Sequence, residues 1–178
     1  MRHPLEAIPA DKRTKVFLPL LVATLLITFA FRFIGPAQPT IVEFELAGTV
    51  TKATDIINAW TSTERSHAGF SLGFDYLYMP IYSTTIALAC VWAATVIRSG
   101  AWRSIGLALA WGTWLAAIFD AIENLGLLVS LFGTPIEPYP QLAAVCATLK
   151  FGLILLGLLY IVAGVILRVI RQPAARAA

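Results

Sequence analysis

The stretch Phe119-Asp120-Ala121-Ile122-Glu123-Asn124 places three polar side chains in the middle of an apolar run from about Ile105 to Phe132. A run of this length predicts a membrane-spanning helix, because about 20 apolar residues cross the hydrocarbon of a bilayer. On a helix Asp120, Glu123 and Asn124 stand at i, i+3 and i+4 and project from one face. The same face carries small residues that let another helix approach closely, namely Ala116, Gly112 and Ala108. The stretch therefore predicts a helix that points a polar cluster into a bundle.

The whole chain has the composition of an integral membrane protein. Of its 178 residues 58% are hydrophobic and only 13% are charged, and the mean hydropathy is +0.79. The apolar residues predict four spanning helices, at about 15–34, 72–97, 105–132 and 141–170. We expect an all-α, polytopic protein with one four-helix domain over 15–170, a flexible lead over 1–14 and a tail over 171–178.

The positions of the basic residues predict the orientation of the chain. Nine of the thirteen Lys and Arg lie in three segments on one side of the predicted spans, namely Arg2, Lys12, Arg13, Lys15, Arg98, Arg103, Arg168, Arg171 and Arg176. The positive-inside rule then places both termini in the cytoplasm and residues 36–71 outside it. Contacts with anionic membrane lipids explain this charge better than nucleic-acid binding does, so we expect no nucleic-acid partner. The first apolar run is longer than a usual signal-peptide core and is expected to stay as an anchor.

The external segment 36–71 is too short to form a domain. Within it, residues 50–61 predict a short amphipathic helix with Thr49 as N-cap and an apolar side that ends at Trp60. A Trp at that place suits the headgroup region, so this helix is expected to lie on the bilayer or to cap the bundle as a lid. A loop that merely packs over the outer face is the alternative. For Glu43 and Glu45 the pattern fits either a strand or a helix.

The second predicted span carries a polar stripe in its outer half. Asp75, Tyr78, Tyr82 and Thr85 stand at i, i+3, i+7 and i+10 and interrupt an otherwise apolar face. Pro80 within the stripe removes a backbone hydrogen bond, so a kink or a widened turn is expected there. An interfacial aromatic belt is the preferred explanation for Tyr76 and Tyr78, whereas the deeper Tyr82 is assigned to the candidate site.

A lysine in the fourth span completes the intramembrane cluster. The third and fourth spans form a hairpin whose apex lies near Ile136; Glu123 is 13 residues before this apex and Lys150 is 14 after it. The two are therefore expected at the same depth, where they can pair. With two acids and one base, one carboxylate is expected to hold a proton near neutral pH. Depth further suggests an outer ion pair of Arg32 with Asp75 or Glu43.

The remaining reactive residue types suggest neither a metal site nor a cofactor. His3 and His67 show no metal-ligand spacing, and Cys90 and Cys146 are expected at different depths as free core residues. Two glycines that the predicted packing leaves unused, Gly106 and Gly126, suggest a homo-oligomer.

Several short segments recur in order in one group of proteins: Phe44-Glu45-Leu46-Ala47, then Gly73-Phe74-Asp75-Tyr76, then Asp120-Ala121-Ile122-Glu123-Asn124. They resemble small, uncharacterised, four-helix proteins of the bacterial inner membrane. The resemblance covers most of the chain after about residue 35. It implies a bacterial inner-membrane location and implies no activity.

Three functions fit the pattern. In the first, the chain binds or carries a lipid-like or cationic amphiphile in an outward-facing cavity between the second, third and fourth spans. Its site residues would be Asp75, Tyr82, Asp120, Glu123, Asn124 and Lys150. In the second, Asp120 or Glu123 is the acid/base catalyst of an enzyme that acts on a lipid substrate. In the third, the polar network only orders the helices of a structural or assembly subunit.

Overall fold

The computed structural model describes residues 2–96 and 99–176, with side chains up to Ile170. Its four long helices are α1 (Ala10–Ile34), α4 (Ser62–Ala93), α5 (Gly100–Phe132) and α6 (Tyr139–Arg176). Each is long and apolar enough to cross a membrane, so the prediction of an all-α fold with four helices able to span a bilayer is confirmed for the described residues. Arg98 and the side chains of Arg171 and Arg176, on which the predicted orientation partly depends, lie outside the described part.

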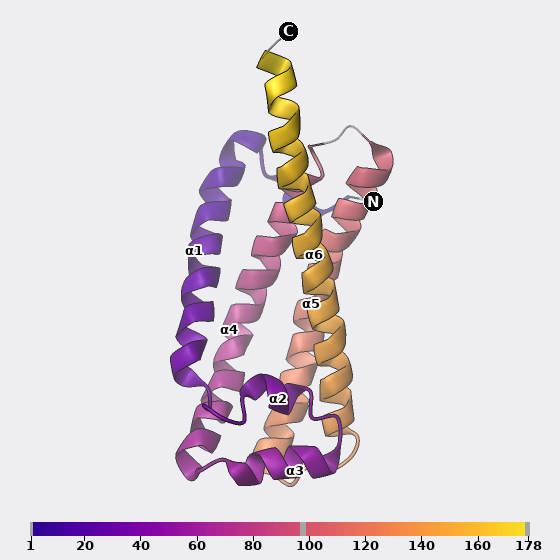
Figure 1. The fold of residues 1–178 in the computed structure, drawn as a ribbon. Coiled ribbons are helices and arrows are strands. Elements are labelled where there is room, and N and C mark those ends of the chain that lie inside the picture. Colours follow the sequence, from indigo (N-terminus) through magenta and orange to yellow (C-terminus); the bar gives the residue numbers. More distant parts are fainter. Residues whose placement is uncertain (1, 97–98, 177–178) are drawn as a thin grey trace.

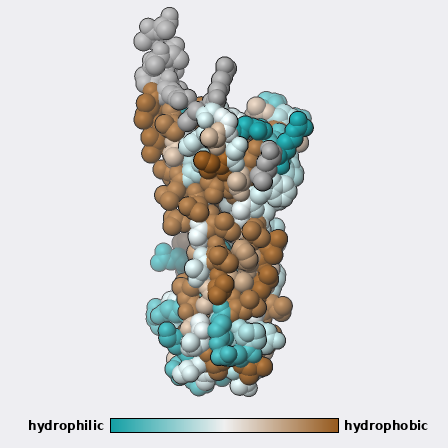
Figure 2. All heavy atoms as spheres, turned by 90° about the vertical axis from the view of Figure 1, so that its right-hand side faces the viewer, coloured by the Kyte–Doolittle hydropathy of each residue, from teal (hydrophilic) through white to brown (hydrophobic). Residues whose placement is uncertain are grey.

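The long helices run side by side, and the two shorter ones cross one end of the bundle (Figure 1). These are α2 (Ile41–Glu45) and α3 (Val50–Ala59). Both chain ends lie toward the opposite end. Between the two ends, Figure 2 shows a broad hydrophobic belt, as expected for a surface that faces lipid tails.

The two short helices form a cap that packs on the bundle. Thr40 and Glu43 make a capping box at the start of α2, and Thr49 caps α3 as predicted. Phe44 of α2 packs edge-on against Trp60, whose indole N–H donates to the carbonyl of Pro39 at 2.7 Å. Trp60 is only 2% exposed. Of the two predicted positions for this segment, the cap is therefore the observed one, and the expectation of Trp60 among lipid headgroups was wrong.

The helix α4 begins ten residues before the predicted start. Its N-cap Thr61 accepts a hydrogen bond from the amide of Glu64, and the Glu64 carboxylate accepts one from the amide of Thr61. The prediction from hydropathy missed this first part because residues 62–67 are mostly polar. The Thr-x-x-Glu spacing of a capping box is present in the sequence and marks the true start.

Small residues set the contacts between α4, α5 and α6. A β-carbon added at Gly157 would lie 3.2 Å from Ile86, and one added at Gly164 would lie 2.7 Å from the β-carbon of Ala93. Gly126 faces Tyr139 and Gly106 faces Tyr160 within the same chain. These last two glycines are thus used internally, and the suggestion of a homo-oligomer that rested on them loses its support.

The N-terminal lead packs against α5, in contrast to the predicted flexible segment. Residues Pro4–Ala7 form a 3₁₀ helix, η1, capped by His3, and the carbonyl of Arg2 accepts a hydrogen bond from the Trp111 indole. Glu6 forms an ion pair with Arg103. Trp111 and Arg103 of α5 thus hold a segment that appears polar and irregular in the sequence.

Candidate functional site

Lys150 lies at the centre of a buried ionic cluster. Its ammonium donates hydrogen bonds to Asp120 Oδ1 at 3.0 Å and to Glu123 Oε1 at 2.9 Å. Lys150 is 4% exposed, Asp120 2% and Glu123 0%. The predicted meeting of the third-span acids with the fourth-span lysine is therefore observed, on the inward face predicted from the small residues.

The cluster has a further member that the sequence analysis did not assign to it. Glu45 of α2 lies with Oε2 3.6 Å from the Lys150 ammonium, and its side chain is buried. Glu43, two residues earlier, instead accepts hydrogen bonds from the amide and hydroxyl of Thr40 at the surface. Because α2 is a helix, these two acids point to different sides. The Thr-x-x-Glu capping signal at 40–43 could have shown this.

Two more hydrogen-bonded pairs extend the cluster toward α4. The Tyr82 hydroxyl donates to Asp120 Oδ2 at 2.8 Å. The Asn124 amide donates to Asp75 Oδ2 at 2.8 Å and to the carbonyl of Leu72 at 3.3 Å. The six residues predicted for the site therefore gather in two adjacent hydrogen-bonded groups. Lys150 holds Asp120, Glu123 and Glu45, with Tyr82 bonded to Asp120, and Asn124 bonds to Asp75.

The predicted outer ion pair does not form. Arg32 is exposed and has no ion-pair partner among the described residues. Asp75 bonds to Asn124, and Glu43 serves as part of the α2 cap. Depth alone suggested the pair, but depth does not say which face of α1 the arginine occupies.

The cluster holds more negative than positive charge. Lys150 is its one base among the described residues, whereas Glu45, Asp75, Asp120 and Glu123 are acids. Three buried acceptor atoms also have no hydrogen-bond donor, namely Glu45 Oε2, Glu123 Oε2 and Asn124 Oδ1. A buried polar atom without a partner is costly. The cluster is therefore short of hydrogen-bond donors as well as of positive charge.

Burial raises the pKa of the Glu45 carboxyl, and the nearby Lys150 ammonium opposes this rise. The negative charge of Asp120 adds to it. Glu45 therefore holds a proton at higher pH than an exposed glutamate would.

A cavity of about 660 Å³ opens beside this cluster. Its walls come from α1, α4 and α6, with α2 at one end and Asp120 as the contribution of α5. The predicted stripe Asp75, Tyr78, Tyr82 and Thr85 lines it, and Glu45 and Lys150 reach it. The prediction placed the cavity between the second, third and fourth spans and missed the first span as a wall.

Hydroxyl groups connect α1 to α4 along this wall. Thr24 Oγ1 lies 2.9 Å from Thr85 Oγ1, and Thr28 Oγ1 lies 2.7 Å from the Tyr78 hydroxyl. Most of the other α1 and α6 residues that line the cavity are apolar, among them Leu21, Leu25, Ile154, Leu158 and Ile161. The cavity therefore has one acidic end and a long apolar remainder.

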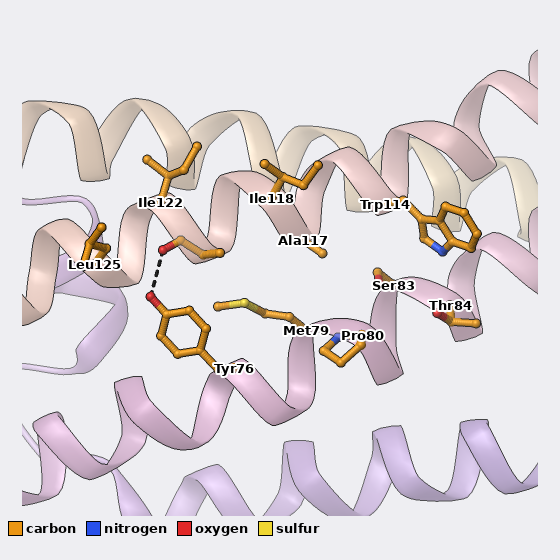
Figure 3. A pocket seen from close by; sticks show the side chains of 11 residues that line it. Tyr76, Met79, Pro80, Ser83, Thr84, Trp114, Ala117, Ile118, Ile122 and Leu125 are labelled. Atoms are coloured by element: carbon orange, nitrogen blue, oxygen red, sulfur yellow. Dashed lines mark hydrogen bonds between the residues drawn. The ribbon is translucent and has the colours of Figure 1, made fainter.

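A second hollow, of about 690 Å³, lies on another face of the bundle between α4 and α5. Figure 3 shows its lining, in which Met79 lies opposite Ala117 and Trp114 lies near Ser83 and Thr84. The Tyr76 hydroxyl donates to the carbonyl of Ala121 at 2.9 Å. The hollow has no charged residue in its lining. Its lining is therefore largely apolar, whereas the acidic cavity carries ionisable groups.

The described residues contain no group of three or more His, Cys, Asp or Glu side chains arranged to hold a metal ion. Both cysteines are free and buried. No protein-family model, curated protein or solved structure matches the sequence. The site is therefore interpreted from its own geometry.

Proposed function

We propose that this chain binds an amphiphile with a cationic head, with the head at the acidic end of the 660 Å³ cavity and the tail between α1 and α6. The single observation that carries this proposal is the excess of acids over bases at one end of a cavity that is otherwise largely apolar. The volume falls within the range of about 300–1,000 Å³ that is usual for small-molecule sites.

Asp75 is the acid best placed to meet such a head. It is only partly buried, it lines the cavity and none of the described residues gives it a cationic partner within 4 Å, whereas Asp120 and Glu123 are both paired with Lys150. Three aromatic rings follow one another along the wall next to it: Phe31 to Tyr78 at 5.5 Å and Tyr78 to Tyr82 at 5.0 Å between ring centroids. Aromatic faces beside a carboxylate favour an alkylammonium group.

One observation favours a purely structural role for part of the network. Lys150 of α6 is paired with acids from α2 and α5, so a single ammonium connects three elements. Such a network can fix the register of the helices without any ligand. An enzymatic role for Asp120 or Glu123 has no comparable support, because both carboxylates are already engaged by Lys150.

We further propose that the chain lies in the bacterial inner membrane with both termini in the cytoplasm. The location rests on the resemblance to small inner-membrane proteins. The orientation rests on basic residues in the elements at the end of the bundle where the chain ends lie, among them Lys12, Arg13, Lys15 and Arg103. The cap of α2 and α3, and with it the acidic end of the cavity, then faces the outside.

The test is binding of three detergent-like probes to the full chain in lipid nanodiscs. Dodecyltrimethylammonium should bind, whereas dodecyl sulfate and the uncharged dodecyl maltoside should bind at least tenfold more weakly. Asp75→Asn should lower the affinity for the cationic probe about tenfold, which corresponds to about 1.4 kcal/mol. Glu43→Gln, which changes an exposed acid of α2, is the matched control and should leave the affinity unchanged.

Equal affinity for the three probes would contradict the proposal. So would an Asp75→Asn variant that folds normally and still binds the cationic probe as the parent chain does. Either result would leave the structural role of the network as the better interpretation.

A further inference from the structure

Glu45 and Glu123 are the least satisfied acids of the cluster. Glu123 Oε1 accepts a hydrogen bond from Lys150, but its Oε2 has no donor although the side chain is fully buried. Glu45 Oε2 lies at 3.6 Å from Lys150 and also lacks a hydrogen-bond donor. Glu45 and Glu123 share the Lys150 ammonium, at 3.6 and 2.9 Å, and this brings their two carboxyl groups together. Two carboxyl groups can hydrogen-bond to each other only when a proton lies between them.

The charge balance also indicates a proton shared by these two carboxyl groups. The ammonium of Lys150 compensates one of the three carboxylates around it, and Asp120 already has two donors, Lys150 and Tyr82. The uncompensated charge therefore falls on Glu45 and Glu123. The described residues provide no metal-holding group here, and one proton neutralises one charge and satisfies both orphan oxygens.

We infer that Glu45 and Glu123 form a carboxyl–carboxylate pair that binds one proton, and that this proton fastens the α2 cap to the bundle at the acidic end of the cavity. The proton passes between the pair and water, and no other group is consumed or formed. Any effect of this proton on ligand binding rests on the proposed function, because the cap lies at the end of the cavity in which that ligand would bind. The proton site itself does not depend on a ligand.

The surroundings of Glu45 set the direction of the pH dependence. The charged groups that face it are Lys150 on α6, Asp120 and Glu123 on α5, and Asp75 across the cavity on α4. Lys52 and Asp55 of α3 line a separate hollow with Glu43. Since burial raises the pKa of Glu45 above its ordinary value, the stability that the proton gives the cap is present at low pH. It is lost as the pH rises through the folded-state pKa.

Infrared spectroscopy of the ligand-free chain in lipid nanodiscs tests the proton directly. The carbonyl stretch of a protonated carboxyl is separate from that of a carboxylate and shifts in D₂O. Glu45→Gln and Glu123→Gln should each remove the signal of one protonated carboxyl per chain at neutral pH, because a shared proton needs both members. Glu43→Gln should leave the signal unchanged.

Loss of the signal in only one of the two single variants would assign the proton to one carboxyl and overturn the shared site. Loss in neither variant would mean that the proton does not need both glutamates, and would also overturn the shared site. Hydrogen exchange in residues 41–45, corrected for the intrinsic effect of pH, should rise with pH in the parent chain but not in Glu45→Gln. An equal rise in both would refute the link to the cap. None of these measurements uses a ligand, so failure of cationic-probe binding would leave them unaffected.

Discussion

The helices α1 and α5 have similar composition and opposite roles. Both are apolar enough to span a membrane, and α1 is the more apolar of the two. Yet α1 contains no buried residue, whereas α5 buries twelve, among them Asp120, Glu123 and Asn124. The comparison teaches that in lipid the polar and small residues, rather than the most hydrophobic ones, mark the helix at the centre of a bundle.

The difference follows from what holds each helix in place. α5 contacts its neighbours through small residues and through the ionic network around Lys150. α1 packs mainly against α4, by two hydroxyl pairs and by aromatic contacts such as Phe31 with Phe74. We therefore regard α4, α5 and α6 as the core of the fold, and α1 as a wall added to one side of the cavity.

The largest expected effect comes from removing the cation of the core. Lys150→Met keeps an unbranched side chain only one atom shorter but leaves Glu45, Asp120 and Glu123 without their positive partner. Breaking a buried ion pair in this way costs about 3–5 kcal/mol. Reversible unfolding in mixed micelles should show a loss of this size.

Two variants make that result specific. Lys52→Met, which removes an exposed lysine of α3, should change the stability little. Adding Asp120→Asn and Glu123→Gln to Lys150→Met should restore part of the loss, because the stranded carboxylates are then neutral. If Lys150→Met alone were as stable as the parent chain, the cluster would not be an ionic one.

The sequence was sufficient to predict much of this core. Spacing gave the common face of Asp120, Glu123 and Asn124, and counting along the hairpin gave the depth of Lys150, because helical rise and period are fixed. The stripe on α4 was found in the same way. These predictions needed only local geometry and the cost of polar groups in a membrane.

What the sequence could not predict depends on how segments meet in space. Glu45 joins the cluster only because the α2 helix folds under the bundle, and residues 42–46 alone fit two structures. The wall formed by α1 has no polar signal apart from Thr24 and Thr28, which also occur in ordinary spans. Arg32 was paired wrongly because the sequence does not fix the rotation of α1 about its axis.

A smaller effect is expected where α1 meets α4. Thr24→Val and Thr28→Val together remove the hydroxyl contacts to Thr85 and Tyr78 with little change in volume. Hydrogen bonds between membrane helices contribute about 0.6 kcal/mol each on average, so the pair should cost about 1 kcal/mol. The same unfolding assay measures the loss. Thr148→Val is the control, because its exposed hydroxyl donates to the carbonyl of Ala144 in its own helix. A loss as large as that of Lys150→Met would mean that α1 belongs to the core.

The smallest expected effect concerns the lead that precedes α1 and packs on α5. His3 is 3% exposed and lies between the rings of Trp111 and Trp114, with centroid distances of 4.8 and 4.5 Å. Its Nδ1 accepts a hydrogen bond from the amide of Leu5 at 3.3 Å. Burial lowers the pKa of His3, although the nearby Glu6 carboxylate opposes this. Neutral His3 therefore suits the docked lead, and protonated His3 does not.

Because the folded-state pKa of His3 lies below its ordinary value of about 6.5, its contribution to docking is complete above that pH and is lost as the pH falls through the folded-state pKa. Hydrogen exchange at Leu5 and Glu6, corrected for the intrinsic effect of pH, should therefore speed up on acidification while α5 stays protected. His3→Asn keeps an N-cap acceptor but cannot titrate in this range, so its exchange should not depend on this transition. If the lead in His3→Asn loosened over the same range as the parent, the ion pair of Glu6 with Arg103, rather than the histidine, would control its attachment to α5.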